Sequence, residues 1–289
     1  MTAAQTILKV GVTGYPLSHT VSPAFQQPAF DHYGIPAEYR PYPVTAEALP
    51  ALIAQLHDTE WLGLNVTIPY KEAVITLVDR CTPTAETIGA VNTLFKKEGS
   101  LIGDNTDAHG FLTALRTDGA TDPSGARVLL LGAGGAGRAV LVALAQAGAS
   151  HITLANRHRE RAEKLLDSLA AALHAQQTAV VDWQSAEAQA AAKAADIIVN
   201  STAVGMAKGP APDLSPLPSS VFRSGQVVFD LVYTPSLTPL LRLAQQGGAR
   251  TLDGLPMLVY QGAAAFERWT GMPAPLKLMK AKAQAALGT

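Results

Sequence analysis

The sequence predicts an α/β protein with mainly parallel sheets. Apolar runs of strand length alternate with longer helix-like segments along the chain, as expected for repeated β-α-β units. The strand-length runs include continuously apolar ones, which is typical of strands buried on both faces of a parallel sheet. A chain of 289 residues also has the length of two domains of the usual ~100–200 residues each.

The first part of the chain mixes strands, helices and one hairpin. Ser22 and Pro23 are the residue types of a helix start, with an N-cap followed by proline in the first turn, and Pro28 is expected to kink or interrupt that helix. In chain order the expected elements are a strand at Ile7–Thr13, a helix from Ser22, a strand at Gly63–Ile68, a helix at Glu72–Asp79, a hairpin of Val91–Lys96 with Ser100–Gly103, and a helix from Asp107 to about Leu115.

A polar, turn-rich segment at residues 117–126 leads into a second unit. Alanine-rich helices are expected between its strands, and residues 208–220 form a loop rich in Pro and Ser. The expected strands are Arg127–Leu131, Ile152–Ala155, Ile197–Asn200 and Val227–Asp230, and a mostly helical tail covers Met257–Leu287.

Composition excludes several classes of protein. The 22 basic and 23 acidic residues give a formal charge of −1, which argues against a nucleic-acid or membrane-surface binder. The single cysteine, Cys81, cannot form an intrachain disulfide, and Met1–Lys9 lacks the pattern of a signal peptide. No apolar stretch reaches the ~18 residues of a membrane span, and the histidines show no metal-ligand spacing. We therefore expect a cytoplasmic protein without a metal site.

A glycine-rich turn follows strand Arg127–Leu131, and an apolar helix is expected after it. The residues of the turn are Gly132, Ala133, Gly134, Gly135, Ala136 and Gly137. A strand before and a helix after are the context that a dinucleotide-binding fingerprint requires. In that motif Gly132 permits the tight turn, Gly134 lets a pyrophosphate approach the backbone, and Gly137 lets helix and strand pack closely. The alternative is a glycine turn that binds no ligand.

The residues after strand Ile152–Ala155 favour NADP over NAD. An NAD site places Asp or Glu at this strand end to bind the ribose 2′-hydroxyl. Here the chain continues with Asn156 and Arg157, and Arg161 follows a turn later. Arginine binds a 2′-phosphate that a carboxylate would repel. If Asn156 caps the next helix, Arg157 and Arg161 lie on one face of it; the alternative is a solvated basic helix start.

Polar residues at the end of strand Gly63–Ile68 mark a candidate ligand site. Asn65 and Thr67 share one face of the strand at its carboxyl end, where open α/β sheets bind ligands. Lys71 is expected in the first turn of the helix that follows Pro69. A lysine there opposes the helix dipole, so helix stability does not explain it. A solvated surface lysine is the alternative.

The other polar candidates have ordinary structural explanations when each is taken alone. Ser22 and Thr106 could cap helices, and Asp107 could be a first-turn acid that the helix dipole favours. Thr20 could be a loop residue, and Asn92 a half-buried strand amide.

Taken together, these segments resemble the shikimate dehydrogenase family, in the same order and over nearly the whole chain. They are far more specific than a dinucleotide fingerprint alone. The segments are GYPLSHTVSP at 14–23, NVTIPYK at 65–71, GAVNT at 89–93, GDNTD at 103–107, the glycine turn, Asn156-Arg157, NSTAVGM at 200–206, DLVY at 230–233 and DGLPMLVYQ at 253–261.

The resemblance implies a fold and an activity. The fold has an α/β substrate-binding domain at residues 1–106, to which C-terminal helices at 255–289 return, and an inserted Rossmann-type NADP-binding domain at 107–254. The activity is the reversible reduction of 3-dehydroshikimate to shikimate by NADPH, in the biosynthesis of chorismate and the aromatic amino acids. Lys71 and Asp107 would form the catalytic pair.

The resemblance also implies two sets of binding residues. Those for the substrate are Thr20, Ser22, Asn65, Thr67, Lys71, Asn92, Asp107, Tyr233 and Gln261. Those for the cofactor are the six residues of the glycine turn together with Asn156, Arg157, Arg161, Thr202, Leu231 and Gly254.

Three positions depart from the family pattern. Thr20 stands where shikimate-specific members usually have Ser, and quinate-using relatives vary in this region. Ala108 replaces the usual glycine after Asn-Thr-Asp, and His158 follows Asn156-Arg157 where Thr is common.

These departures leave two other functions open. One is a shikimate/quinate dehydrogenase with relaxed substrate or cofactor choice, and the other is a catalytically silent relative that binds shikimate-like ligands. The presence of both Lys71 and Asp107 favours an enzyme. Apart from a small-molecule substrate, the expected partner is at most a second copy of the chain in a homodimer.

Overall fold

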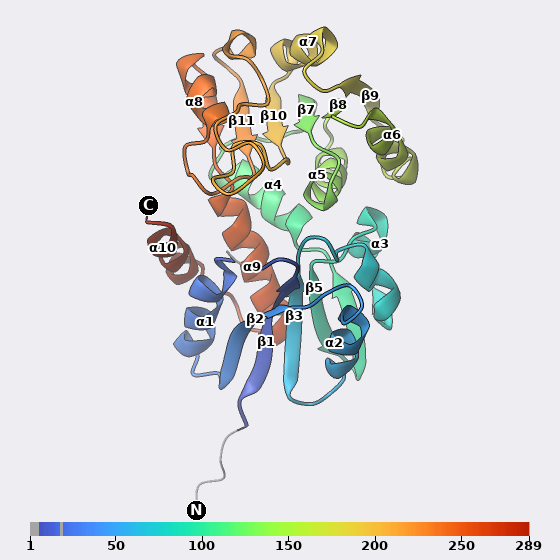
Figure 1. Ribbon diagram of the computed structural model, residues 1–289, viewed down its shortest axis with the longest axis vertical. Helices are drawn as coiled ribbons and strands as arrows, with labels where there is room; N and C mark the ends of the chain where they lie inside the picture. The colour runs from blue at the N-terminus through green and yellow to red at the C-terminus, as the bar shows by residue number, and fades with distance from the viewer. Residues whose placement is uncertain (1–5, 18–19, 289) are drawn as a thin grey trace, which may run out of the picture. The chain divides into compact units, whose positions relative to one another are not determined.

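The computed structural model describes residues 6–17 and 20–288, and the chain divides into two compact units (Figure 1). Unit 1 comprises residues 1–110 and 259–289, and unit 2 comprises residues 111–258. The boundaries expected from the sequence fall after residues 106 and 254. The compact units divide about one helical turn further along, within α4 (Asp107–Thr117) and α9 (Leu255–Thr270).

Unit 1 is built on a mixed six-stranded sheet with the strand order β2-β1-β3-β5-β6-β4. Its strands are β1 (Leu8–Gly14), β2 (Ala37–Pro43), β3 (Trp61–Val66), β4 (Arg80–Cys81), β5 (Thr93–Lys97) and β6 (Ser100–Asp104). β1 pairs in parallel with β2 and β3, whereas β5 is antiparallel to both β3 and β6. The carboxyl ends of β3 and β6 therefore lie beside the amino end of β5, and this edge of the sheet carries the candidate site.

Helices cover the sheet of unit 1, and contacts among them and with the sheet hold the C-terminal segment of the unit in place. They are α1 (Ser22–His32), α2 (Leu49–Gln55), the 3₁₀ helix η1 (Ala73–Leu77), α3 (Pro83–Ile88), α10 (Leu276–Leu287) and the greater part of α9. Phe30 of α1 packs on Phe266 and Trp269 of α9. The Trp269 indole N–H donates to the backbone carbonyl of Leu94 in β5 at 2.9 Å. A Cβ at Gly63 would lie 2.3 Å from that indole nitrogen, so only glycine lets α9 pack this closely on the sheet.

Two elements of unit 1 differ from the expectation. Pro28 does not interrupt helix α1, which continues through it, and the hydrogen bond that its missing N–H leaves out falls on the carbonyl of Ala24, an exposed residue that water can reach. The helix expected at Glu72–Asp79 is the short 3₁₀ helix η1. It ends early because Asp79 is bound to β6 at Leu101, through its backbone N–H and its carboxylate.

Unit 2 is a doubly wound parallel sheet with the strand order β12-β11-β10-β7-β8-β9, which confirms the predicted Rossmann-type fold. Its strands are β7 (Arg127–Leu131), β8 (His151–Asn156), β9 (Gln177–Asp182), β10 (Ile197–Asn200), β11 (Val227–Asp230) and β12 (Arg250–Leu252). Its helices are α5 (Gly135–Gln146), α6 (Arg159–Ser168), α7 (Ala186–Ala194), η2 (Ser219–Val221) and α8 (Pro239–Gln246). The strand order reverses between β7 and β10, and ligands of this fold bind at the carboxyl ends of the strands there.

None of the helices in the described residues is long and apolar enough to cross a membrane. The same residues contain no group of three or more His, Cys, Asp or Glu side chains that could hold a metal ion.

Candidate active site

Three neighbouring strands of unit 1 bring polar side chains to one edge of the sheet. Asn65 of β3 lies opposite Thr93 of β5, and Thr93 lies opposite Asp104 of β6. β6 then leads through Asn105 into α4, whose first residue is Asp107. The antiparallel register thus gathers motifs that are about forty residues apart in the chain.

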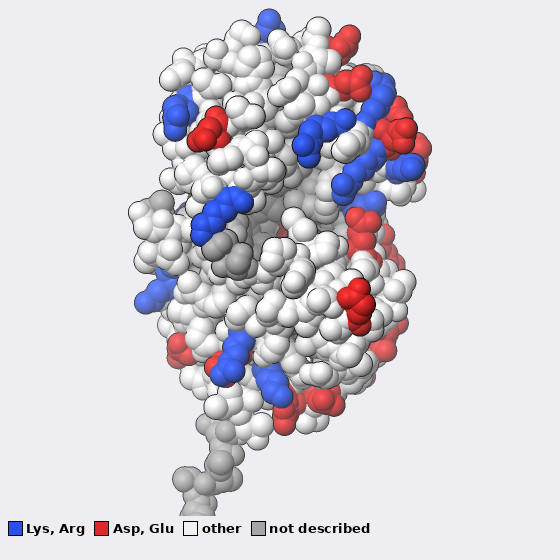
Figure 2. Space-filling view, viewed as in Figure 1, with Lys and Arg blue, Asp and Glu red and all other residues white. Residues whose placement is uncertain are grey.

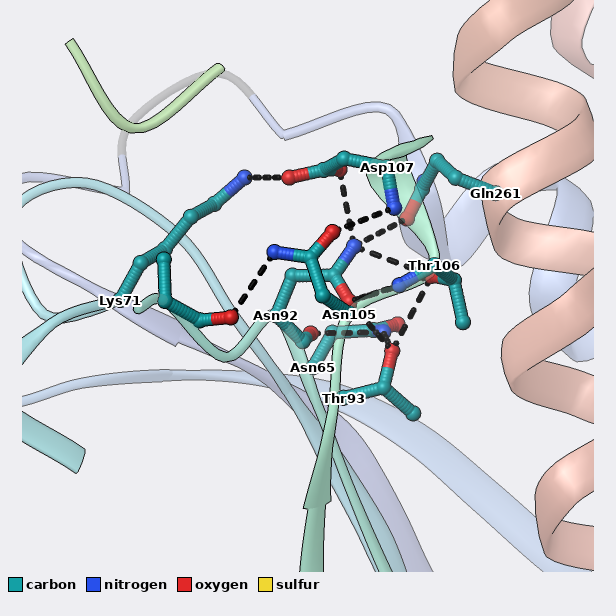
Figure 3. Close-up of polar contacts among 9 residues, drawn as sticks. Asn65, Lys71, Asn92, Thr93, Asn105, Thr106, Asp107 and Gln261 are labelled. Atoms are coloured by element: carbon teal, nitrogen blue, oxygen red, sulfur yellow. Dashed lines mark hydrogen bonds and ion pairs between the residues drawn. The ribbon is translucent and has the colours of Figure 1, made fainter. Parts of the chain in front are cut away.

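Lys71, which is half-buried, and Asp107, which is buried, form an ion pair, with Lys71 Nζ 2.5 Å from Asp107 Oδ2 (Figure 3). Their side chains are only 15% and 7% exposed. Lys71 precedes η1, so the expectation that it lies in a helical first turn is wrong. Its carbonyl accepts the N–H of Val91 at 2.7 Å, which ties its backbone to the segment before β5. Removing one partner of such a pair would leave the other charge buried and alone, so each side chain holds the other in place.

Asn92 holds the second oxygen of the Asp107 carboxylate. Its Nδ2 donates to Asp107 Oδ1 at 2.8 Å, to Thr106 Oγ1 at 3.0 Å and to Gln261 Oε1 at 3.3 Å (Figure 3). Its Oδ1 accepts the backbone N–H of Thr106 at 2.8 Å. Because Lys71 binds one carboxylate oxygen and Asn92 the other, the orientation of Asp107 is fixed from both sides.

Two side chains hold the turn before α4. The Thr106 hydroxyl donates to Asn92 Oδ1 at 3.1 Å. Asn105 Oδ1 accepts the backbone N–H of Asp107, the first residue of α4, at 3.0 Å. Its Nδ2 donates to the carbonyl of Ala90 at 2.9 Å, which connects the turn to the segment before β5.

Asn65 belongs to the same network and connects it to Tyr39 of β2. The Tyr39 hydroxyl donates to Asn65 Oδ1 at 2.8 Å, and Asn65 Nδ2 donates to Asn92 O and Thr93 Oγ1, both at 3.2 Å. Burial raises the pKa of Tyr39 far above its ordinary value, while a hydrogen bond with Ser22 lowers the pKa by less. The phenol therefore keeps its hydrogen. Sequence reasoning missed Tyr39, because one tyrosine in a strand has no distinctive spacing.

The two residues expected to bind a substrate carboxylate lie at the start of α1. Thr20 Oγ1 accepts the backbone N–H of Ser22 at 3.3 Å, and both residues are half-buried. The N-cap is Val21 rather than Ser22, which is the first helical residue, so the capping alternative for Ser22 is wrong. Residues 18 and 19 of the same motif lie outside the described residues. Thr67 follows β3 and is half-buried.

Helix α9 carries Gln261, and an ion pair attaches it to β6. Arg268 Nε donates to Asp104 Oδ2 at 2.8 Å, and the Arg268 guanidinium lies 5.9 Å from the centre of the Phe95 ring. Thr82 and the backbone N–H of Asn105 bind the other oxygen of Asp104. These contacts fix the position of α9 relative to the strands of the sheet. They therefore also fix the place of Gln261 in the network.

In unit 2 the glycine turn joins β7 to α5 and has the geometry that a dinucleotide requires. Gly132 has a φ of +101°, in the region that favours glycine. A Cβ at Gly137 would lie 2.6 Å from the Gly132 carbonyl oxygen, so glycine is needed for α5 to pack on the turn. A Cβ at Gly134, the N-cap of α5, would meet no atom within 4 Å. The backbone is open there beside a helix N-terminus, which fits a pyrophosphate.

The basic residues after β8 are arranged differently from the expectation. The N-cap of α6 is His158, and Asn156 Nδ2 donates to the His158 carbonyl at 2.9 Å. Arg157 therefore precedes the helix and does not share a helical face with Arg161. Both arginines are exposed, whereas Arg159 is engaged with acidic side chains. Figure 2 shows basic side chains, with acidic ones among them, on the surface around α6.

The other expected cofactor residues, Thr202, Leu231 and Gly254, follow the carboxyl ends of β10, β11 and β12. The Thr202 hydroxyl donates to Asn200 Oδ1 at 2.7 Å, and the Leu231 N–H donates to the Asn200 carbonyl at 2.9 Å. A Cβ at Gly254 would lie 2.0 Å from the Leu231 carbonyl oxygen, so the two backbones are in direct contact. Tyr233 also belongs to unit 2, where it is half-buried, and burial raises its pKa. The remaining expected substrate residues belong to unit 1.

Three family profiles match successive parts of the chain. They are the shikimate dehydrogenase substrate binding domain at residues 12–94, shikimate / quinate 5-dehydrogenase at 115–230 and the shikimate 5′-dehydrogenase C-terminal domain at 254–284. A relative in Symbiobacterium thermophilum named shikimate dehydrogenase (NADP(+)) is 43% identical over 282 residues, which cover 96% of this chain and 94% of the relative. The chain belongs to the shikimate dehydrogenase family.

Solved structures of shikimate dehydrogenases and related enzymes share the fold. Shikimate 5-dehydrogenase of Thermus thermophilus, in complex with NADP(H) and shikimate, has a TM-score of 0.85 at 38% identity, over 97% of this chain and 100% of that one. Quinate dehydrogenase of Corynebacterium glutamicum, in complex with NAD, has a TM-score of 0.87 at 30% identity, over 96% of this chain and 99% of that one. Relatives of similar fold thus differ in both substrate and cofactor.

Proposed function

We propose that this chain is an NADP-dependent shikimate dehydrogenase that interconverts 3-dehydroshikimate and shikimate. The observation that carries the proposal is the Lys71–Asp107 ion pair, fixed by Asn92, in a family whose relatives carry that name. Unit 1 would bind the substrate, and unit 2 would bind NADP. A homodimer stays a prediction, which light scattering on the purified protein checks.

Reduction of a ketone requires a hydride at the carbonyl carbon and a proton at its oxygen. NADPH supplies the hydride when it is bound. Lys71 Nζ has three N–H donors, of which one points to Asp107. We assign a second donor to the substrate oxygen, so that the proton passes from Lys71 as the new C–H bond forms. Asp107 orients the ammonium group and accepts a hydrogen bond from a neighbouring substrate hydroxyl.

The hydrogen bonds of the network support different roles for its polar residues, with some binding the substrate and others orienting Asp107. Both amide hydrogens of Asn65 are used within the protein, so Asn65 would meet a substrate hydroxyl as an acceptor, through the free lone pair of Oδ1. Asn92 has protein partners on its amide nitrogen and its oxygen, which supports a role in orienting Asp107. Thr20 and Ser22 would bind the substrate carboxylate, while Thr67, Tyr233 and Gln261 would complete the substrate site.

The cofactor would lie along the carboxyl ends of the unit 2 strands. Its pyrophosphate would rest on the glycine turn, and its nicotinamide end near Thr202, Leu231 and Gly254. Asn156 would help to hold the turn beside the adenosine. The exposed Arg157 and Arg161 support NADP, because no acidic residue stands at the end of β8 to bind a free 2′-hydroxyl.

The experiment that tests the proposal measures reduced-nicotinamide absorbance with purified protein, crossing shikimate and quinate against NADP⁺ and NAD⁺. We expect turnover with shikimate and NADP⁺ to exceed that of the other three pairings. Equal turnover with quinate or NAD⁺ would instead support relaxed substrate or cofactor choice. Absence of turnover, with shikimate binding still detectable, would support the catalytically silent alternative.

A further inference from the structure

Asp230, the last residue of β11, is a buried carboxylate to which the mechanism above gives no task. It has no exposed surface. Its Oδ1 accepts from Asn200 Nδ2 at 2.9 Å and from the backbone N–H of Val232 at 3.1 Å. Its Oδ2 accepts from the Thr238 hydroxyl at 2.7 Å. The carboxylate therefore joins the ends of two neighbouring strands to the loops that follow them.

The contact with Asn200 orients the side-chain amide around which the loop at residues 201–204 folds. A carboxylate only accepts hydrogen bonds, so it forces the Nδ2 end of Asn200 toward itself. The Asn200 Oδ1 end is then left for Thr202, which donates to it from its backbone N–H at 3.1 Å and its hydroxyl at 2.7 Å. Asn200 Nδ2 also donates to the carbonyl of Val204 at 3.3 Å. The loop at residues 201–204 is therefore folded around one amide whose direction Asp230 sets.

This carboxylate is unfavourable for folding in its charged form. Burial raises the pKa of Asp230, hydrogen bonds from Thr238, Val232 and Asn200 lower it, and the charge of Asp253 adds a smaller increase, so that the net pKa is about 6. A neutral side chain would avoid the desolvation penalty, but it would not impose one direction on the Asn200 amide. A perturbed carboxyl beside a ligand loop is typical of a functional site.

We propose that Asp230 is a positioning residue for the cofactor, which acts by fixing the Asn200 amide and through it the loop that carries Thr202. The inference rests on the proposed function, in which this loop lies beside the nicotinamide end of NADP. Asp230 itself touches neither the substrate nor the reacting atoms in this scheme.

The test compares Asp230→Ala with Thr238→Val in the full chain. Thr238→Val removes the third bond to Asp230 and the cap of α8, where the Thr238 hydroxyl accepts the N–H of Leu241. It leaves the Asp230–Asn200 bond in place, so it is a matched control for stability.

In Asp230→Ala we expect kcat to fall by up to about 100-fold, because displacing a positioned group by ~1 Å can cost that much in rate. The KM for NADP⁺ should rise while the KM for shikimate stays unchanged. Thr238→Val should keep the wild-type kinetic constants.

A second measurement is independent of catalysis. Amide hydrogen exchange of Thr202 and Val204 in the ligand-free protein should accelerate in Asp230→Ala and stay unchanged in Thr238→Val. Because it needs no cofactor, it separates failure of this inference from failure of the proposed function. Unchanged exchange in folded Asp230→Ala, or equal kinetic losses in the two variants, would overturn the inference. If Asp230→Ala does not fold, Asp230→Asn takes its place, since its amide can present either end to Asn200; wild-type exchange in that variant would overturn the inference.

Discussion

At the scale of single residues, Lys71 and Asp107 are held by different means. Lys71 has its backbone tied to Val91, and its side chain reaches Asp107 across the strand edge. Asp107 is held by Asn92 on its side chain and by Asn105 on its backbone N–H. Each charge is therefore positioned before a substrate arrives, so the proposed proton transfer would need little reorganisation in its transition state.

Replacing Lys71, the proposed proton donor, tests this arrangement directly. Lys71→Ala should lower kcat by about 10²–10⁴-fold, the usual contribution of a positioned general acid or base, with a smaller change in KM for shikimate. Steady-state NADPH absorbance measures both quantities. Lys9→Ala is the matched control, since Lys9 forms an exposed ion pair with Glu60, and it should leave kcat unchanged. Near-normal turnover in Lys71→Ala would contradict the assignment.

The arginines after β8 provide a second comparison between single residues. Loss of one hydrogen-bonded charge costs about 1.5–3 kcal/mol, so Arg157→Ala or Arg161→Ala should weaken NADPH binding by about 10–100-fold and leave NADH binding unchanged. Arg159→Ala should have little effect, because Arg159 is paired with Glu163 and Asp182. Binding is measured by quenching of protein fluorescence. An equal loss for NADPH and NADH would show that these residues do not bind the 2′-phosphate.

The candidate site was partly predictable from the sequence at this scale. Residues such as Asn65, Lys71 and Asp107 stand in short motifs whose residue types carry chemistry, so sequence could single them out. The partners of Asn65 could not be found in this way. Tyr39 lies on another strand, and its contact with Asn65 depends on the parallel pairing of β1 with both β2 and β3.

At the scale of elements, two glycines of the glycine turn allow loss of stability to be separated from loss of cofactor binding. Gly137→Ala should destabilise unit 2 by about 1–3 kcal/mol, because its Cβ would overlap the Gly132 carbonyl oxygen. Gly134→Ala should cost less than about 1 kcal/mol in stability, because its Cβ would meet open space. It should nonetheless weaken NADPH binding by about tenfold or more, since the methyl group would stand in the proposed path of the pyrophosphate. Thermal unfolding and NADPH titration of both variants check the contrast; unchanged NADPH affinity in Gly134→Ala would contradict it.

The sequence predicts the central, buried strands better than the strands at the sheet edges. The central strands β7, β10 and β11 were predicted because buried parallel strands are continuously apolar. The strands β2, β9 and β12 lie at the edges of the two sheets, and the sequence pattern does not predict them. β2 contains two prolines among polar residues, and β9 is largely exposed, so neither has an apolar pattern.

At the scale of the whole molecule, Asp230 makes the stability of unit 2 depend on pH. Its pKa is about 6 in the folded protein against 3.8 for the ordinary group, so the folded state binds more protons between these values. Folding stability therefore falls as pH rises through this window, by about 3 kcal/mol. Asp230→Asn lacks this titration, so the variant should gain stability relative to wild type as pH rises from about 4 to about 7. Scanning calorimetry of both proteins measures the difference, and a difference that is independent of pH would contradict the raised pKa.

The division of the chain into one continuous unit and one interrupted unit has a consequence for its synthesis on the ribosome. Unit 2 is encoded in a single stretch, whereas unit 1 needs residues 259–289, which contain Gln261, Trp269 and the helix α10 that packs on α1. Domains fold as units while the chain emerges. The cofactor-binding unit is therefore complete while the nascent substrate-binding unit still lacks the helix that closes its core, and the polar network around Asn92 receives Gln261 only after unit 2 has been synthesised.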